Sequence, residues 1–153
     1  MLSTRSQRSV DLEVWGMTMK ILFLCVANSA RSQLAEGLAK NILGEGHEIR
    51  SAGSVPATQV NPLAIKALSE MGIDISSHRP KTWDELPPAF FINLDYVITL
   101  CAEEACPTIA VKAKKLHWDL PDPAAVSGSD EERLGAFRKT RDEIKKRLEA
   151  FQK

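Results

Sequence analysis

The chain has 153 residues, of which 44% are hydrophobic and 26% charged, and this length and composition predict one globular domain with a conventional core. Its formal net charge is +0 and no apolar run is long enough to span a bilayer, so we expect neither a nucleic-acid nor a membrane partner. Three cysteines, an odd number, argue against a secreted disulfide framework and favour a reducing, cytoplasmic compartment.

The first 18 residues differ in character from the rest of the chain. They are polar, show no sustained hydrophobic period and lack the apolar centre of a signal peptide. We expect residues 1–18 to form a poorly ordered tail and residues 19–153 to form the domain, as a monomer. A short helix around residues 10–15 that docks through Trp15 is the alternative.

A strand, a short loop and a helix are predicted at the start of the domain. Residues 20–24 are an apolar run rich in strand formers, and apolar residues recur at helical spacing from about Arg31 to Leu43. The N–H groups of a short loop between them can curl inward at the positive end of the helix dipole and bind a tetrahedral oxyanion. Arg31 adds a planar fork of donors. The expected oxyanion-binding residues are Val26, Ala27, Asn28, Ser29, Ala30, Arg31 and Ser32.

Cys25 lies at the base of this predicted loop. Donors that hold an anion also stabilise a thiolate, and Ser32 can donate a hydrogen bond to the sulfur. A thiolate beneath a bound oxyanion is a nucleophile aimed at the central atom. A lone intracellular cysteine is more often a small buried hydrophobe. The strand before the loop, the helix after it and Ser32 beside Arg31 favour the nucleophile.

Two later segments carry signals for helix starts. Asn61 can cap a helix with Pro62 at its first position, and Gly72 is expected to end that helix. Ser129 and Glu132 form a capping box that opens the last helix, in which apolar residues again recur at helical spacing.

Strand and helix patterns alternate along the rest of the chain. Strands are expected at residues 47–51, 95–100 and 115–118, and a short proline-interrupted helical segment at residues 83–91. The alternation predicts a three-layer α/β fold with a four-stranded parallel sheet. Ligands of such folds bind at the carboxyl ends of strands, where Cys25 falls.

The stretch from Cys25 to Gly37, Cys-Val-Ala-Asn-Ser-Ala-Arg-Ser-Gln-Leu-Ala-Glu-Gly, resembles the active-site loop of the low-molecular-weight protein tyrosine phosphatases. It is most similar to the arsenate reductases built on that fold, and the resemblance extends over residues 19–151. The sequence departs from the family at Ala27, where glycine is usual, and at Ala30, where many members carry a second cysteine. The resemblance implies a reductase for arsenate, with weak phosphatase activity and no cofactor. The alternative is a phosphatase for small phosphomonoesters or phosphotyrosine.

Cys101 follows the strand expected at residues 95–100, so it shares a sheet edge with Cys25 if the two strands are neighbours. The segment from Thr99 to Pro107 resembles the redox segment of thioredoxin-coupled arsenate reductases. This implies that Cys101 attacks the arsenylated Cys25, that Cys106 attacks the resulting disulfide, and that thioredoxin reduces the product. If Cys106 is an inert thiol, glutathione with a glutaredoxin is the alternative reductant. A regular helix would separate Cys101 from Cys106, so their segment must be irregular or unwind.

Asp122-Pro123 follows the last expected strand, and the resemblance implies that the Asp122 carboxyl protonates the leaving oxygen. Asp119 is the alternative acid, and an Asp-Pro turn without chemistry is common in loops. Ala124-Ala125 stands where the phosphatases carry aromatic residues that wall a phenyl slot, which favours a small inorganic oxyanion.

The remaining candidates are assigned structural roles. His47, His78 and His117 are expected to be surface or hydrogen-bonded histidines, and Trp83 and Trp118 packing residues. The resemblance raises a potassium site at Asn28, Glu36 and Ser51, but its completing aspartate is replaced near Lys81. We therefore predict no potassium, and no metal site.

Overall fold

The structure is a computed structural model that describes residues 18–102 and 106–151. The tail predicted at residues 1–18 lies outside the described residues except for Thr18, which is exposed. The strands are β2 (Lys20–Cys25), β3 (Glu48–Gly53), β4 (Tyr96–Thr99) and β5 (Lys114–His117). The helices are α1 (Arg31–Leu43), α2 (Pro62–Ser69) and α3 (Asp130–Phe151), with 3-10 helices η2 (Trp83–Glu85), η3 (Pro88–Phe91) and η4 (Pro123–Ala125).

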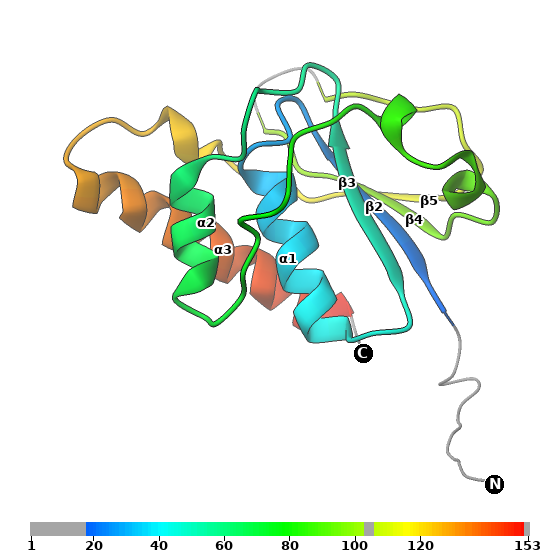
Figure 1. Ribbon diagram of the computed structural model, residues 1–153, viewed down its shortest axis with the longest axis horizontal. Helices are drawn as coiled ribbons and strands as arrows, with labels where there is room; N and C mark the ends of the chain where they lie inside the picture. The colour runs from blue at the N-terminus through cyan, green and yellow to red at the C-terminus, as the bar shows by residue number, and fades with distance from the viewer. Residues whose placement is uncertain (1–17, 103–105, 152–153) are drawn as a thin grey trace, which may run out of the picture.

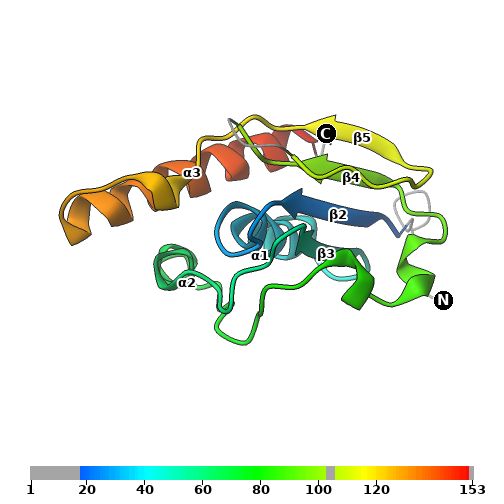
Figure 2. The same ribbon diagram turned by 90° about the horizontal axis from the view of Figure 1, so that it is seen from above.

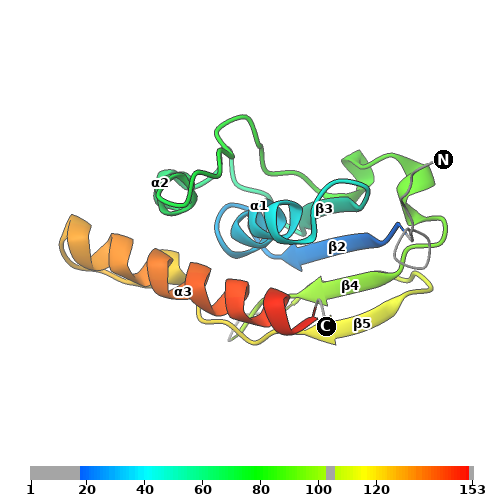
Figure 3. The same cartoon turned by 90° about the horizontal axis from the view of Figure 1, so that it is seen from below.

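The four strands form one sheet in the order β3-β2-β4-β5, and all its pairs are parallel. This confirms the predicted α/β fold with a four-stranded parallel sheet. The long helices lie on one side of the sheet and η2 and η3, in green, on the other (Figure 1). α2 packs on α1 and α3 and lies farther from the sheet than they do (Figure 2, Figure 3).

β2 is an inner strand of the sheet, and its side chains alternate between the two faces. Ile21 and Phe23 face the cluster formed with α1, α2 and α3, whereas Leu22 and Leu24 face the cluster that contains η3. All four are fully buried, which explains why the strand reads as a continuous apolar run. None of the helices within the described ranges is long and apolar enough to cross a membrane.

Most element boundaries follow the sequence signals. The Asn61 side chain accepts a hydrogen bond from the Leu63 N–H at 2.9 Å, as its predicted cap role requires. The predicted capping box of the last helix is formed as well, by reciprocal bonds of 2.8 and 3.1 Å between Ser129 and Glu132. α2 ends at Ser69, and Gly72 terminates it as predicted: its φ is 76°, and the N–H groups of Gly72 and Ile73 donate 3.0 Å hydrogen bonds to the carbonyls of Ser69 and Leu68.

Residues 83–91 form two 3-10 turns separated by Leu86 and Pro87, which agrees with the proline-interrupted helical segment predicted there. Proline has no N–H for a helical bond and disfavours the helical conformation of the residue before it. Pro87 and Pro88 therefore divide the segment.

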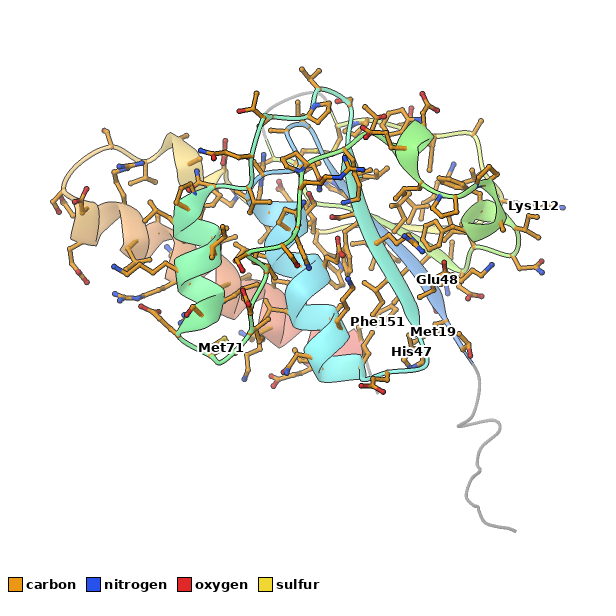
Figure 4. All side chains as sticks on the ribbon, in the orientation of Figure 1. Met19, His47, Glu48, Met71, Lys112 and Phe151 are labelled. Carbon is orange, nitrogen blue, oxygen red and sulfur yellow. A yellow bond between two sulfur atoms is a disulfide. The ribbon has the colours of Figure 1, made fainter. Side chains whose placement is uncertain are left out.

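The aromatic and histidine side chains support the sheet as predicted. Trp118 is buried and its ring centroid lies 6.1 Å from that of Phe23 and 6.3 Å from that of Phe151. His47 Nδ1 accepts a 3.0 Å hydrogen bond from the Met19 N–H, and the two side chains lie together at the start of the sheet (Figure 4).

Candidate active site

The loop between β2 and α1 runs along residues 54–61. The carbonyl oxygens of Val26, Ala27 and Ser29 each accept a 2.9 Å hydrogen bond, from the N–H groups of residues 55, 57 and 61. In a trans peptide the C=O and the next N–H point in opposite directions, so the following N–H groups face away from residues 54–61. This is the inward-facing arrangement predicted for an oxyanion loop. A side chain at Gly53 would overlap the Val26 carbonyl oxygen, which explains the glycine that closes β3.

Cys25 is 2% exposed at the base of the loop and is a free thiol. Ser32 Oγ lies 2.8 Å from its sulfur, and the Asn28 N–H donates to the sulfur at 3.2 Å. Asn28 Nδ2 also donates to Ser32 Oγ at 2.7 Å. Ser32 Oγ accepts from Asn28, and its hydroxyl is placed to donate to the sulfur when Cys25 is a thiolate. The sulfur thus lies within hydrogen-bond distance of the Asn28 N–H and the Ser32 hydroxyl.

Asn28 is fully buried and has a φ of 51°, which is uncommon for a residue with a side chain. Its Nδ2 donates to Ser51 Oγ at 3.0 Å as well as to Ser32. Its Oδ1 accepts from Gln33 Nε2 and from the Lys81 N–H, each at 3.1 Å. These bonds offset the cost of the left-handed backbone, which is of order 1–3 kcal/mol.

Arg31, the first residue of α1, is 4% exposed. Its Nη1 donates to the Leu120 carbonyl at 2.9 Å and to the Leu100 carbonyl at 3.4 Å. The guanidinium therefore joins the loop to the end of β4 and to the segment after β5. These three segments lie at the carboxyl ends of the strands and carry the predicted catalytic residues.

A cavity of about 40 Å³ lies at this edge, lined by Cys25, Ala27, Ser29, Ala30, Arg31, Asp122 and Ala124. The structure thus places Asp122 beside Cys25, whereas the alternative acid Asp119 is exposed and outside the lining. Of the predicted oxyanion-binding residues, Val26, Asn28 and Ser32 do not line this cavity. A larger cavity of about 360 Å³ lies against η2 and η3 and contains none of the predicted site residues.

Cys101 and Cys106 form a disulfide with a Cα–Cα distance of 5.5 Å. β4 pairs with β2, and the Leu100 N–H donates to the Leu24 carbonyl at 3.0 Å. Cys101 therefore follows a neighbour of the strand that ends at Cys25, which meets the condition set by the sequence. Cys101 is 1% exposed and Cys106 is half-buried. The irregular segment predicted between them falls on residues 103–105, outside the described residues.

The sequence pattern of the low molecular weight phosphotyrosine protein phosphatases matches residues 20–153. The chain belongs to this family. It is 44% identical over 133 residues to an arsenate reductase of Halalkalibacterium halodurans, an alignment that covers 86% of this chain and 93% of the relative.

Solved structures of arsenate reductases have a similar fold. An arsenate reductase from Archaeoglobus fulgidus superposes with a TM-score of 0.71 at 27% identity, over 87% of this chain and 98% of that one. A thioredoxin-dependent arsenate reductase from Corynebacterium glutamicum gives a TM-score of 0.59 at 32% identity, over 87% of this chain and 63% of that one. These relatives confirm the resemblance stated from the sequence.

The side chains that the family suggests as potassium ligands are hydrogen-bonded to one another. Ser51 donates to Glu36 at 2.5 Å, and Glu36 also accepts from Lys40 at 2.6 Å. Asn28 turns its Nδ2 toward Ser51 and its Oδ1 toward two N–H donors. These side chains are thus joined to one another, and the absence of potassium at this site stays a prediction. No group of three or more metal-ligating side chains was found within residues 18–102 and 106–151.

The hydrogen bonds and charges of this network shift the pKa of two side chains behind the loop, Glu36 and Lys81. Burial raises the pKa of Glu36, but hydrogen bonds from Lys40 and Ser51 and the charges of Lys40 and Lys81 outweigh it, so the pKa is lowered overall. Burial lowers the pKa of Lys81, against the charge of Glu36. The Glu36 carboxylate therefore stays ionised at neutral pH and keeps its bond to Ser51.

Proposed function

We propose that the protein is an arsenate reductase that converts arsenate to arsenite through Cys25, Cys101 and Cys106. The observation that carries this proposal is the disulfide between Cys101 and Cys106. Cys101 follows the carboxyl end of β4, next to the strand that ends at the free thiol Cys25. A phosphatase needs one nucleophilic thiolate and no further cysteines. The arsenate reductases at 44% identity support the same activity.

In the first step arsenate binds the inward-facing N–H groups of the loop and the Arg31 guanidinium. The Cys25 thiolate attacks arsenic and forms a sulfur–arsenic bond. Asp122, in the wall of the same cavity, gives its proton to the departing hydroxyl, which leaves as water. The donors are fixed before the reaction, and donors of this kind stabilise a transition state by roughly 3–4 kcal/mol each.

In the second step the Cys101 thiolate attacks the Cys25 sulfur. A Cys25–Cys101 disulfide forms, the electron pair of the sulfur–arsenic bond passes to arsenic, and arsenite leaves. The Cys106 thiolate then attacks the Cys101 sulfur and releases Cys25 as a thiolate. This sequence of bonds ends in the arrangement that the structure holds, with Cys101–Cys106 oxidised and Cys25 free.

An external dithiol must reduce that disulfide for a second turnover. It reaches Cys106 first, because Cys106 is half-buried whereas Cys101 is 1% exposed. Thioredoxin is the proposed reductant, as in the thioredoxin-dependent relative from Corynebacterium glutamicum. Glutathione with a glutaredoxin is the alternative, and either reaction belongs to the reducing cytoplasm.

The test is purified protein with arsenate and either thioredoxin, its reductase and NADPH, or glutathione and glutaredoxin, followed by arsenite release. Multiple turnovers are expected with thioredoxin. Cys101→Ser is expected to bind arsenate but to release no arsenite. Full turnover of Cys101→Ser with thioredoxin would rule out the relay.

Phosphatase activity on small phosphomonoesters is the second candidate, favoured by the cavity itself. Cys25, Arg31 and Asp122 line it together, and this set suffices for phosphoryl transfer to a thiolate. The wall formed by Ala27, Ala30 and Ala124 offers no aromatic slot for a phenyl ring, so only weak activity is expected. If this were the main activity, Cys101→Ser would leave its rate unchanged and the wild type would reduce no arsenate.

A further inference from the structure

Gln33 is fully buried behind the oxyanion loop, and both ends of its side-chain amide are engaged. Its Nε2 donates to the Asn28 carbonyl at 3.2 Å, to Asn28 Oδ1 at 3.1 Å and to the Arg79 carbonyl at 3.2 Å. Its Oε1 lies 3.0 Å from His78 Nδ1. The loop motif includes Gln33 but predicts no role for it, and His78 is expected to be structural.

Only one orientation of the Gln33 amide satisfies these partners. Rotation by 180° would place Oε1 against three acceptor oxygens, of Asn28 and Arg79, and Nε2 against His78. Because an amide oxygen can only accept, His78 Nδ1 must be the donor in this contact. The carbonyls of Asn28 and Arg79 thus set the orientation of the Gln33 amide, and that orientation requires a proton on His78 Nδ1.

Gln33, together with the Lys81 N–H, sets the orientation of the Asn28 side chain. Asn28 Oδ1 faces the Gln33 donor, so Nδ2 faces Ser32 Oγ. Ser32 Oγ accepts from that Nδ2, and its own proton is available to a Cys25 thiolate. A chain of hydrogen bonds thus runs from His78 through Gln33, Asn28 and Ser32 to Cys25.

His78 can donate from Nδ1 whether it is neutral or charged, and its surroundings favour the neutral form. Burial lowers its pKa, and the charges of Lys40 and Lys81 lower it further, against Glu36 and Asp74. The Asn28 backbone also depends on Gln33, because the same Nε2 bonds its carbonyl while the φ of Asn28 is 51°.

We propose that Gln33 is a positioning residue for the Cys25 thiolate, acting through Asn28, and that the Nδ1 proton of His78 supports the Gln33 amide by donating to its oxygen. The consequence for arsenate rests on the proposed function; the effect on Cys25 itself does not. Gln33 touches neither Cys25 nor the cavity, so its influence has to appear in the reactivity of the sulfur.

The test measures alkylation of Cys25 by iodoacetamide against pH in a Cys101→Ser, Cys106→Ser background, where Cys25 is the only thiol. Gln33→Met keeps the length of the side chain and removes its hydrogen bonds. We expect the midpoint of the pH–rate curve to move up and the rate at neutral pH to fall about tenfold, the effect of one net hydrogen bond. Gln59→Met, at an exposed glutamine beside the loop, is the matched control and is expected to leave the curve in place.

A pair of His78 variants separates positioning from simple packing. The amide nitrogen of His78→Asn can take the place of Nδ1 and is expected to preserve the curve, whereas that of His78→Gln falls nearer Nε2 and is expected to move it as Gln33→Met does. Equal curves for Gln33→Met and the background, or equal shifts for both His78 variants, would overturn the proposal. Because alkylation uses no arsenate, a wild type that reduces none would remove the proposed function and leave this result standing.

Discussion

Arg31 Nη1 donates a 2.9 Å hydrogen bond to the carbonyl oxygen of Leu120, in the segment that leads to Asp122. Arg31 and Asp122 also line the same cavity. One guanidinium therefore holds the acid segment against the loop that carries Cys25. The residue that is expected to bind the oxyanion thus also contacts the segment that carries the proposed acid.

Arg31→Lys tests this double role. A lysine keeps the charge but has no planar fork, so it cannot bond Leu120 and pair two oxyanion oxygens together. We expect kcat/KM for arsenate to fall by roughly 100-fold or more, the effect of losing one preorganised donor. Arg133→Lys, at an exposed position on α3, is the control and should stay near wild type. A loss of less than threefold in Arg31→Lys would show that charge alone suffices.

Asp122→Asn removes the proton that the leaving hydroxyl takes. Asparagine can still accept the 3.0 Å hydrogen bond that Asp122 Oδ1 receives from the Ala124 N–H, so the η4 turn should persist. Loss of a general acid lowers rates by about 10²–10⁴-fold, and we expect arsenite release in a single turnover to slow by that amount with arsenate affinity nearly unchanged. Asp119→Asn, exposed and outside the cavity, should react at the wild-type rate. The reverse result would identify Asp119 as the acid.

Cys106→Ser separates the two thiol steps. Without Cys106 nothing resolves the Cys25–Cys101 disulfide, so a reduced sample should release one arsenite per chain and stop. Mass spectrometry of a non-reduced digest should then find Cys25 joined to Cys101. Continued turnover of Cys106→Ser with thioredoxin would make Cys106 dispensable, and turnover with glutathione and glutaredoxin alone would identify the other reductant.

The sequence predicts the parts of this site that are local in the chain. The apolar run of β2, the short loop and the start of α1 lie within residues 20–43, and the Asn61 cap and the Ser129–Glu132 capping box each span a few residues. The pairing of β2 with β4 is long-range, and it entered the prediction only as a condition on the place of Cys101.

The contact between Gln33 and His78 could not be predicted from the sequence. These residues are 45 positions apart, and neither a glutamine nor a histidine carries a periodic signal that would bring them together. Gly72 and the prolines of residues 83–91, by contrast, are local signals, and each marks a break in helical structure that the structure shows.

The pH dependence of stability can be tested at the contact between α2 and α3. Glu70 accepts hydrogen bonds from Arg138 and Arg141, and those from Arg138 are the main reason that its pKa is lowered from 4.5 to about 2. A carboxylate with a lowered pKa stabilises the fold above its unfolded pKa, and that contribution is lost as pH falls toward its folded pKa. The free energy of unfolding should therefore decrease between pH 4.5 and about 2.

Glu70→Gln should flatten that part of the curve and lower the free energy of unfolding at neutral pH, measured by urea denaturation. Glu131→Gln is the matched control, since Glu131 bonds only one of the two arginines and its side chain is 79% exposed. It should leave the slope near wild type. An unchanged slope in Glu70→Gln would mean that solvent screens the pair, since Glu70 lies at the surface, and that other carboxylates determine the acid unfolding of this protein.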